Sequence, residues 1–150
     1  MKKNILMLFL IFSIGISFAQ PREHNKKQFE QMKADKIAFI TTELDLTPKE
    51  AQVFWPVYNE YDAAVELLRK KRRSYFKELR KSETISDDRK FELMKLLFES
   101  EKNESLVRLK YLEEFNKVIG KKKAANVFIA EEQFKRKLLD KIRGEGPPPR

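Results

Sequence analysis

The longest regular pattern of apolar residues in the chain lies between residues 54 and 79. Eight positions follow one another here at spacings of four and three residues in alternation, and all but Arg72 are apolar or aromatic. This spacing is typical of a helix that packs along its length against another helix. The sequence therefore predicts a long helix here. The eight positions are Phe54, Tyr58, Tyr61, Val65, Leu68, Arg72, Tyr75 and Leu79.

The start of this helix is marked by the stretch Leu46-Thr47-Pro48-Lys49-Glu50. Thr47 is suited to be the N-cap, because its hydroxyl can accept a hydrogen bond from a free backbone N–H one turn later. Pro48 then occupies the first helical position, where its missing N–H costs nothing. Glu50 lies three residues after the cap and can accept from the Thr47 N–H. Together these residues predict a capping box.

Three further segments show helical periodicity, at about residues 29–45, 87–119 and 121–143. Ser86 is placed to cap the second of them, and Gly120 to end it in a left-handed conformation. Residues 100–105 interrupt its apolar face, and we interpret Glu101 and Glu104 there as surface charges. The residues expected to form the core-facing side of this helix are Phe91, Met94, Leu97, Phe98, Leu106, Leu109, Leu112, Phe115 and Ile119.

No stretch of the chain shows the alternation typical of a strand, and no Asn-Gly or Asp-Gly hairpin turn is present. We therefore expect an all-α fold of four helices, two of them long. Short connections favour antiparallel neighbours, so the expected protomer is an elongated, hairpin-like layer of helices.

The N-terminus has the features of a secretory signal peptide. Lys2 and Lys3 precede an uncharged, mostly apolar run, and the chain then reads Ser17-Phe18-Ala19. This pattern predicts cleavage after Ala19 and export. The expected organisation is a signal peptide over 1–19, a disordered lead-in over 20–27, a helical domain over 28–143 and a disordered proline-rich tail over 144–150.

Charge and composition narrow the class of function. The net charge is +9, which in an exported protein favours anionic partners such as lipid headgroups or acidic polypeptide over nucleic acid. The chain has no cysteine and a single histidine, His24, and it contains neither a HExxH motif nor a glycine-rich phosphate loop. We therefore expect no enzymatic activity, no metal site and no cofactor.

The order of these features resembles the periplasmic LTxxQ-motif family of envelope stress proteins (Spy/CpxP-like). The specific part of the resemblance is Leu46 to Tyr61, with Glu50 at the position of the final Gln. It is nearest to the group labelled as sensors of extracytoplasmic-function sigma factors. The resemblance implies a periplasmic protein whose hairpin-like protomers pair into a curved homodimer.

Two functions follow as expectations. The first is an ATP-independent chaperone that holds unfolded or damaged envelope proteins on a basic, partly apolar helical surface. The alternative is an envelope-stress sensor that binds one membrane-bound regulator, and a structural envelope protein is also kept open. Peripheral contact with an anionic membrane surface is a further expected partner interaction, and nucleic acid is not one.

Aromatic and basic residues of the long helix are the candidates for the binding surface. The five consecutive basic residues 69–73 could attract acidic clients. Phe54, Tyr58 and Tyr61 lie on the helix seam and could instead be interhelical core, whereas Trp55, one position off the seam, is the better surface candidate. The full candidate set is Phe54, Trp55, Tyr58, Tyr61, Arg69, Arg72, Arg73, Tyr75 and Phe76.

Overall fold

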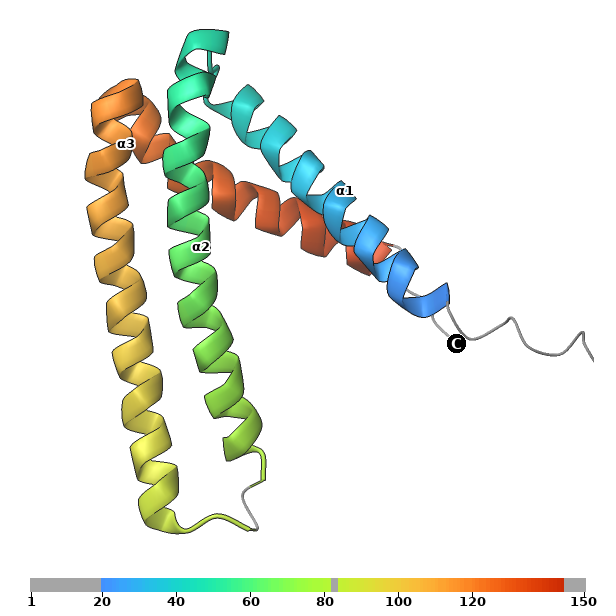
Figure 1. Ribbon diagram of the computed structural model, residues 1–150, viewed down its shortest axis with the longest axis vertical. Helices are drawn as coiled ribbons and strands as arrows, with labels where there is room; N and C mark the ends of the chain where they lie inside the picture. Colours follow the sequence, from blue (N-terminus) through green and yellow to red (C-terminus); the bar gives the residue numbers. More distant parts are fainter. Residues whose placement is uncertain (1–19, 82–83, 145–150) are drawn as a thin grey trace, which may run out of the picture. The chain divides into compact units, whose positions relative to one another are not determined.

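The computed structural model describes residues 20–81 and 84–144, with side chains from residue 26 onward. Over these residues the chain forms three helices and no strand (Figure 1): α1 (Gln20–Glu43), α2 (Pro48–Leu79) and α3 (Asp87–Gly144). The all-α prediction is confirmed, but the expected number of four helices is wrong. The predicted signal peptide and the tail after Gly144 lie outside the described residues. No helix in the described part is long and apolar enough to cross a membrane.

The two last helices expected from the sequence are one element because only a single residue between them leaves the helical conformation. Gly120 has φ 79° and ψ 159°, a backbone conformation that is essentially restricted to glycine. Helical residues flank it on both sides. We call residues 87–119 the first limb of α3 and residues 121–144 the last limb. Gly120 thus has the predicted positive φ, but it bends the helix instead of ending it.

The α1 helix starts earlier than expected and ends in a defined turn. It begins at Gln20, inside the stretch predicted to be disordered, because Pro21 is tolerated in a first turn and the polar residues that follow are good helix formers. At its other end Asp45 adopts a positive φ of 47°. The Asp45 and Leu46 N–H groups donate to the carbonyls of Thr42 (3.0 Å) and Thr41 (3.1 Å). This is a Schellman motif, and it satisfies carbonyls that the helix end would leave free.

The predicted caps of α2 and α3 are confirmed. The Glu50 N–H donates to the Thr47 hydroxyl at 3.3 Å, and the Thr47 N–H donates to Glu50 Oε2 at 2.9 Å. For α3, the Arg89 N–H donates to the Ser86 hydroxyl at 3.3 Å. The α2 helix then continues through Pro56 without interruption to Leu79. Local sequence signals therefore set where both long helices begin.

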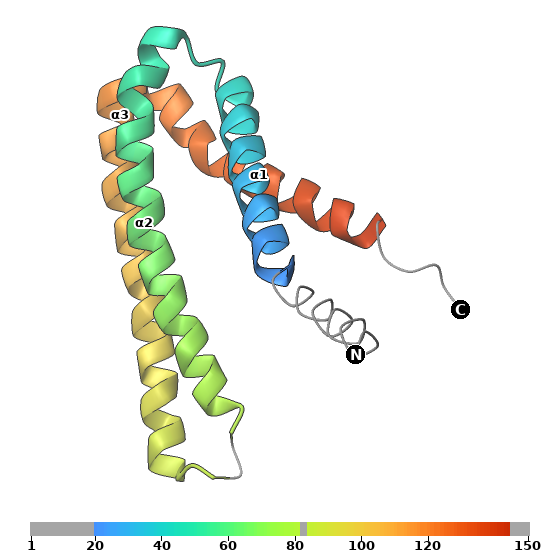
Figure 2. The same ribbon diagram turned by 45° about the vertical axis from the view of Figure 1, so that its right-hand side comes forward.

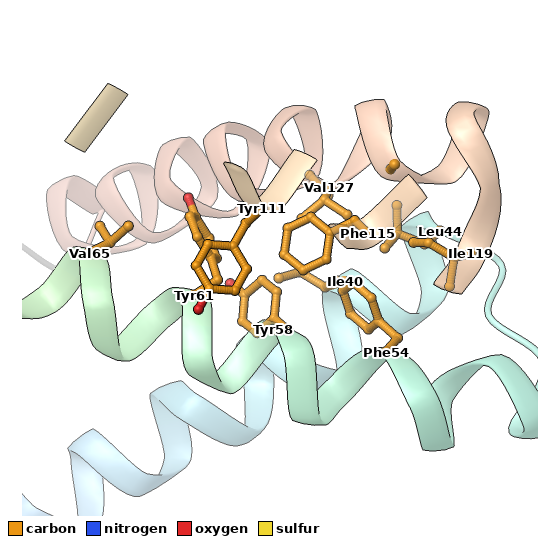
Figure 3. Close-up of a cluster of buried hydrophobic side chains, with 12 residues drawn as sticks. Ile40, Leu44, Phe54, Tyr58, Tyr61, Val65, Tyr111, Phe115, Ile119 and Val127 are labelled. Carbon is orange, nitrogen blue, oxygen red and sulfur yellow. The ribbon is translucent and has the colours of Figure 1, made fainter. Parts of the chain in front are cut away.

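The chain divides into two compact units, residues up to 38 and residues from 39 onward. In the second unit, α2 and the first limb of α3 run side by side in opposite directions in both views (Figures 1 and 2). The last limb of α3 turns back after Gly120 and packs its residues into the same core. Figure 3 shows this core, to which the C-terminal end of α1, the first half of α2 and both limbs of α3 contribute. Its members are Ile40, Leu44, Phe54, Tyr58, Tyr61, Val65, Tyr111, Phe115, Ile119, Ala124, Val127 and Ala130.

Candidate functional site

Three of the predicted binding residues belong to this core. Phe54, Tyr58 and Tyr61 are 0%, 3% and 1% exposed, so they cannot form a contact surface for another protein. Their rings meet that of Phe115, at centroid distances of 5.4, 6.2 and 5.6 Å. Of the two interpretations that the sequence left open for these residues, the structure favours interhelical core.

The hydroxyls of the two core tyrosines converge on one carboxylate. Tyr58 donates to Glu131 Oε1 at 2.6 Å, and Tyr61 donates to Glu131 Oε2 at 3.0 Å. Burial, and then the negative charge of Glu131, raise the pKa of both phenols above the ordinary value. Sequence patterns do not reveal this contact, because the partners lie 73 and 70 residues apart. It fastens the last limb of α3 to α2.

A second carboxylate neutralises part of the predicted basic cluster. Glu104 is only 7% exposed, so interpreting it as a surface charge was wrong. It accepts from Arg69 Nη2 at 3.1 Å, Arg72 Nη1 at 2.9 Å and Arg108 Nη2 at 3.2 Å. Burial alone would raise the pKa of Glu104, but the charges and hydrogen bonds of Arg69 and Arg72 outweigh burial and lower it. These arginines therefore hold α2 to α3 and are not a free cationic collar.

The remaining predicted residues differ in accessibility. Arg73 is exposed and forms an ion pair with Glu66. Trp55 is half-buried and packs edge-on against Phe54 and Tyr58, at ring-centroid distances of 5.0 and 5.2 Å. Tyr75 is also half-buried, and Phe76 is exposed. Only Arg73 and Phe76 of the nine predicted residues are thus open to solvent.

The motif residues at the start of α2 are tied to α3 by Lys123, which the sequence analysis did not single out. Lys123 Nζ donates to Glu50 Oε2 at 2.8 Å and to the Asp45 carbonyl at 2.7 Å. The hydrogen bond from Lys123, followed by those from the Thr47 backbone and hydroxyl, lowers the pKa of Glu50 to about 2. The motif is therefore a structural joint between α1, α2 and α3.

We expect this joint to make stability depend on pH in acid. The pKa of Glu50 is about 2 in the folded chain and 4.5 ordinarily, so the unfolded chain takes up the proton first as the pH falls. The stabilisation from Glu50 is complete above pH 4.5 and is lost as the pH falls towards 2. The urea midpoint of the wild type should exceed that of Glu50→Gln at neutral pH, and the difference should disappear across this window. Glu60→Gln, an exposed change on α2, is the control, and a difference for Glu50→Gln that persists down to pH 2 would contradict the prediction.

A row of exposed apolar side chains lies on the first limb of α3. Five large side chains that were expected to face the core are 39–65% exposed. At about 100° per residue they fall on one flank of the helix, roughly 130° from the side that packs on α2. The side that does face α2 carries Leu93, Leu97, Ser100 and Glu104. We call the exposed set the α3 stripe: Phe91, Met94, Phe98, Leu106 and Leu109.

Polar contacts with α2 explain why the other side of the first limb is buried. The Ser100 hydroxyl donates to the Leu68 carbonyl at 3.2 Å. One turn later, the Glu104 carboxylate accepts hydrogen bonds from Arg69 and Arg72. The break in the α2 pattern at Arg72 therefore meets the polar stretch of α3. Pairing these groups orients α3 and turns the α3 stripe outward.

The described residues present exposed apolar surface on α3. Among residues 26–81 and 84–144, no three His, Cys, Asp or Glu side chains gather where they could hold a metal ion. The carboxylate of Glu104 accepts hydrogen bonds from arginines, and that of Glu131 accepts them from tyrosines. What this part of the molecule can do chemically is bury the α3 stripe against an apolar partner.

Comparison with known proteins returned no family model, no curated protein and no solved structure that matches this chain.

Proposed function

We propose that this protein holds unfolded segments of other polypeptides on the α3 stripe, as an ATP-independent chaperone of the cell envelope. The observation that carries the proposal is the stripe itself. Phe91, Phe98 and Leu109 are each more than 60% exposed, on a helix whose opposite side has a well-packed partner. Several exposed large apolar side chains on one flank of a helix are a common mark of a site that binds other proteins.

The dimensions of the stripe suit a short stretch of extended chain. From Phe91 to Leu109 the helix rises about 27 Å at 1.5 Å per residue. An extended polypeptide covers that length in about eight residues. Met94 adds a flexible side chain that adapts to varied apolar partners. Such a surface supports weak binding of varied segments more readily than recognition of one folded shape.

The sequence resemblance supports the same proposal. The LTxxQ-like stretch at Leu46–Glu50 and the signal-peptide pattern of residues 1–19 both point to an envelope stress protein. Pairing of two protomers, with an elongated and curved form, belongs to this proposal as well. Sedimentation of the purified mature chain measures that pairing, and the mass of the exported protein tests cleavage after Ala19.

We expect Phe91→Ser/Phe98→Ser to abolish most of the chaperone activity. The measurement is light scattering of a chemically denatured client diluted into buffer without ATP, with the mature chain at equimolar and fivefold ratios. The matched control is Val53→Ser/Leu67→Ser, which removes two exposed apolar side chains from the solvent side of α2. The control should suppress aggregation as the wild type does. Because all four residues are exposed, neither variant should change the free energy of unfolding by more than about 1 kcal/mol.

Three results would overturn the proposal. Absence of suppression by the wild type at fivefold excess would remove the chaperone function, and capture of a single membrane regulator would then favour the sensor. Equal loss in both variants would show that the α3 stripe has no special role. Conversion of a dimer into a monomer by Phe91→Ser/Phe98→Ser would show that the stripe is where two copies of this chain meet.

A further inference from the structure

We propose that the α3 stripe selects segments in which an acidic residue lies between two apolar residues, in the pattern apolar–x–acidic–x–apolar. This inference rests on the proposed function and specifies its substrate class. The observation behind it is the charge on the stripe. Between Phe91 and Leu109, the charged residues within about 50° of the centre of the stripe are Lys95 and Lys102, at about 100° per residue.

The acidic residues of the same helix point elsewhere. Glu92, Glu99 and Glu101 lie about 75–105° around the helix from the centre of the stripe. The charge of Lys95 already interacts with two residues of its own helix: its Nζ lies 3.0 Å from Glu92 Oε1 and 5.0 Å from the centre of the Phe91 ring. Within the described part of the chain, Lys102 takes part in no ion pair. The positive charge open to a ligand on the stripe is therefore centred on Lys102.

The arginines that seemed to supply a cationic surface do not compete with Lys102 for an acidic ligand. Arg69 and Arg72 are bound to the buried Glu104, and Arg73 is bound to Glu66. Their charges are balanced in part by the carboxylates that they contact. Electrostatic selection by this face therefore depends on Lys102, with a smaller contribution from Lys95.

The spacing along the helix defines the ligand pattern. Lys102 lies midway between Phe98 and Leu106, about 6 Å along the axis from each at 1.5 Å per residue. In an extended chain, residues i, i+2 and i+4 share one face and are separated by about 6.6 Å per pair of residues. A segment laid along the stripe can thus set apolar side chains on Phe98 and Leu106 while a carboxylate between them meets Lys102.

Two labelled peptides that differ only at the central residue test this inference. One has the core Phe-Ser-Glu-Ser-Phe and the other Phe-Ser-Lys-Ser-Phe, with neutral flanks and blocked ends. By fluorescence anisotropy at low salt, the wild-type chain should bind the Glu peptide about three- to tenfold more tightly than the Lys peptide. A single exposed charge pair contributes little, but here the attraction of Lys102 for Glu adds to its repulsion of Lys. The preference should shrink in high salt, which screens exposed charges.

Reversing the charge of Lys102 is the decisive test. Lys102→Glu should invert the preference, so that the Lys peptide binds more tightly. Lys70→Glu changes the net charge equally on an exposed position of α2 and should leave the preference for the Glu peptide in place. Inversion by Lys102→Glu alone supports the inference.

The failures of the two proposals are distinguishable. Equal binding of both peptides to the wild type, abolished by Phe91→Ser/Phe98→Ser, would contradict the proposed acidic ligand pattern. The proposal that the α3 stripe binds unfolded segments would then still hold. If Lys70→Glu inverts the preference as Lys102→Glu does, only net charge matters and the assignment to the stripe is wrong. If neither peptide binds and aggregation is not suppressed, the proposed function itself fails.

Discussion

Replacing Phe115 with alanine is expected to lower the free energy of unfolding by about 3–5 kcal/mol, the usual cost of removing a buried aromatic side chain. Phe115 is fully buried, and its ring lies among those of Phe54, Tyr58, Tyr61, Tyr111 and Phe128. These rings come from α2 and from both limbs of α3. Alanine would leave a cavity at the point where the three segments meet, and rings held by several neighbours cannot collapse to fill it.

Urea unfolding followed by far-ultraviolet circular dichroism gives this difference. The control is Phe91→Ala, which removes the same side chain from the same helix at a position 65% exposed. Its effect should stay within about 0.5 kcal/mol, as for most surface changes. Equal losses for the two variants would mean that the first limb of α3 faces α2 with the α3 stripe and that the described core is wrong.

Replacing Glu104 with alanine is expected to cost about 2–3 kcal/mol. The variant removes the acceptor of hydrogen bonds from three arginines and leaves those positive charges close together without a counter-charge. The figure lies below that for a fully buried pair, because Arg69, Arg72 and Arg108 keep 26–38% of their side-chain surface exposed to water.

A matched ion pair on the surface separates this effect from the general loss of a glutamate. Glu66→Ala removes the exposed partner of Arg73 and should cost less than about 1 kcal/mol. The two variants are compared by urea unfolding in low salt and in 0.5 M salt. A loss for Glu104→Ala that is no larger than the loss for Glu66→Ala would show that the arginine cluster contributes little to holding α2 against α3.

Much of the helical organisation was predictable because its causes are local. The capping box of Thr47 and Glu50 forms within four residues, and the Ser86 cap does the same for α3. The regular stripe of α2 also predicted its buried face correctly, since Phe54, Tyr58, Tyr61 and Val65 are all buried. That helix has a single apolar face along its first half, so periodicity alone was sufficient.

The exposed apolar side of α3 was not predicted, because this helix carries two apolar faces. Leu93 and Leu97 lie on one, and Phe91 and Phe98 on the other. Hydrophobic periodicity cannot choose between two such faces, and the expected core-facing set combined residues of both, so that the exposed Phe91 and Phe98 were placed with the buried Leu97. The sequence did contain a relevant signal, namely that Arg72 interrupts the α2 pattern while the polar residues 100–105 interrupt that of α3.

The sequence by itself therefore determined the all-helical class, the starts of α2 and α3 and the positive φ of Gly120, because caps and glycine conformations depend on neighbouring residues. Only the tertiary structure decided which face of α3 is buried, that Glu104 and Glu131 join helices, and that Lys123 holds the Leu46–Glu50 motif. Those choices depend on pairing polar groups between residues 32 to 78 positions apart. The cost of leaving such groups unpaired in the interface selects one orientation of α3, and this orientation exposes the α3 stripe.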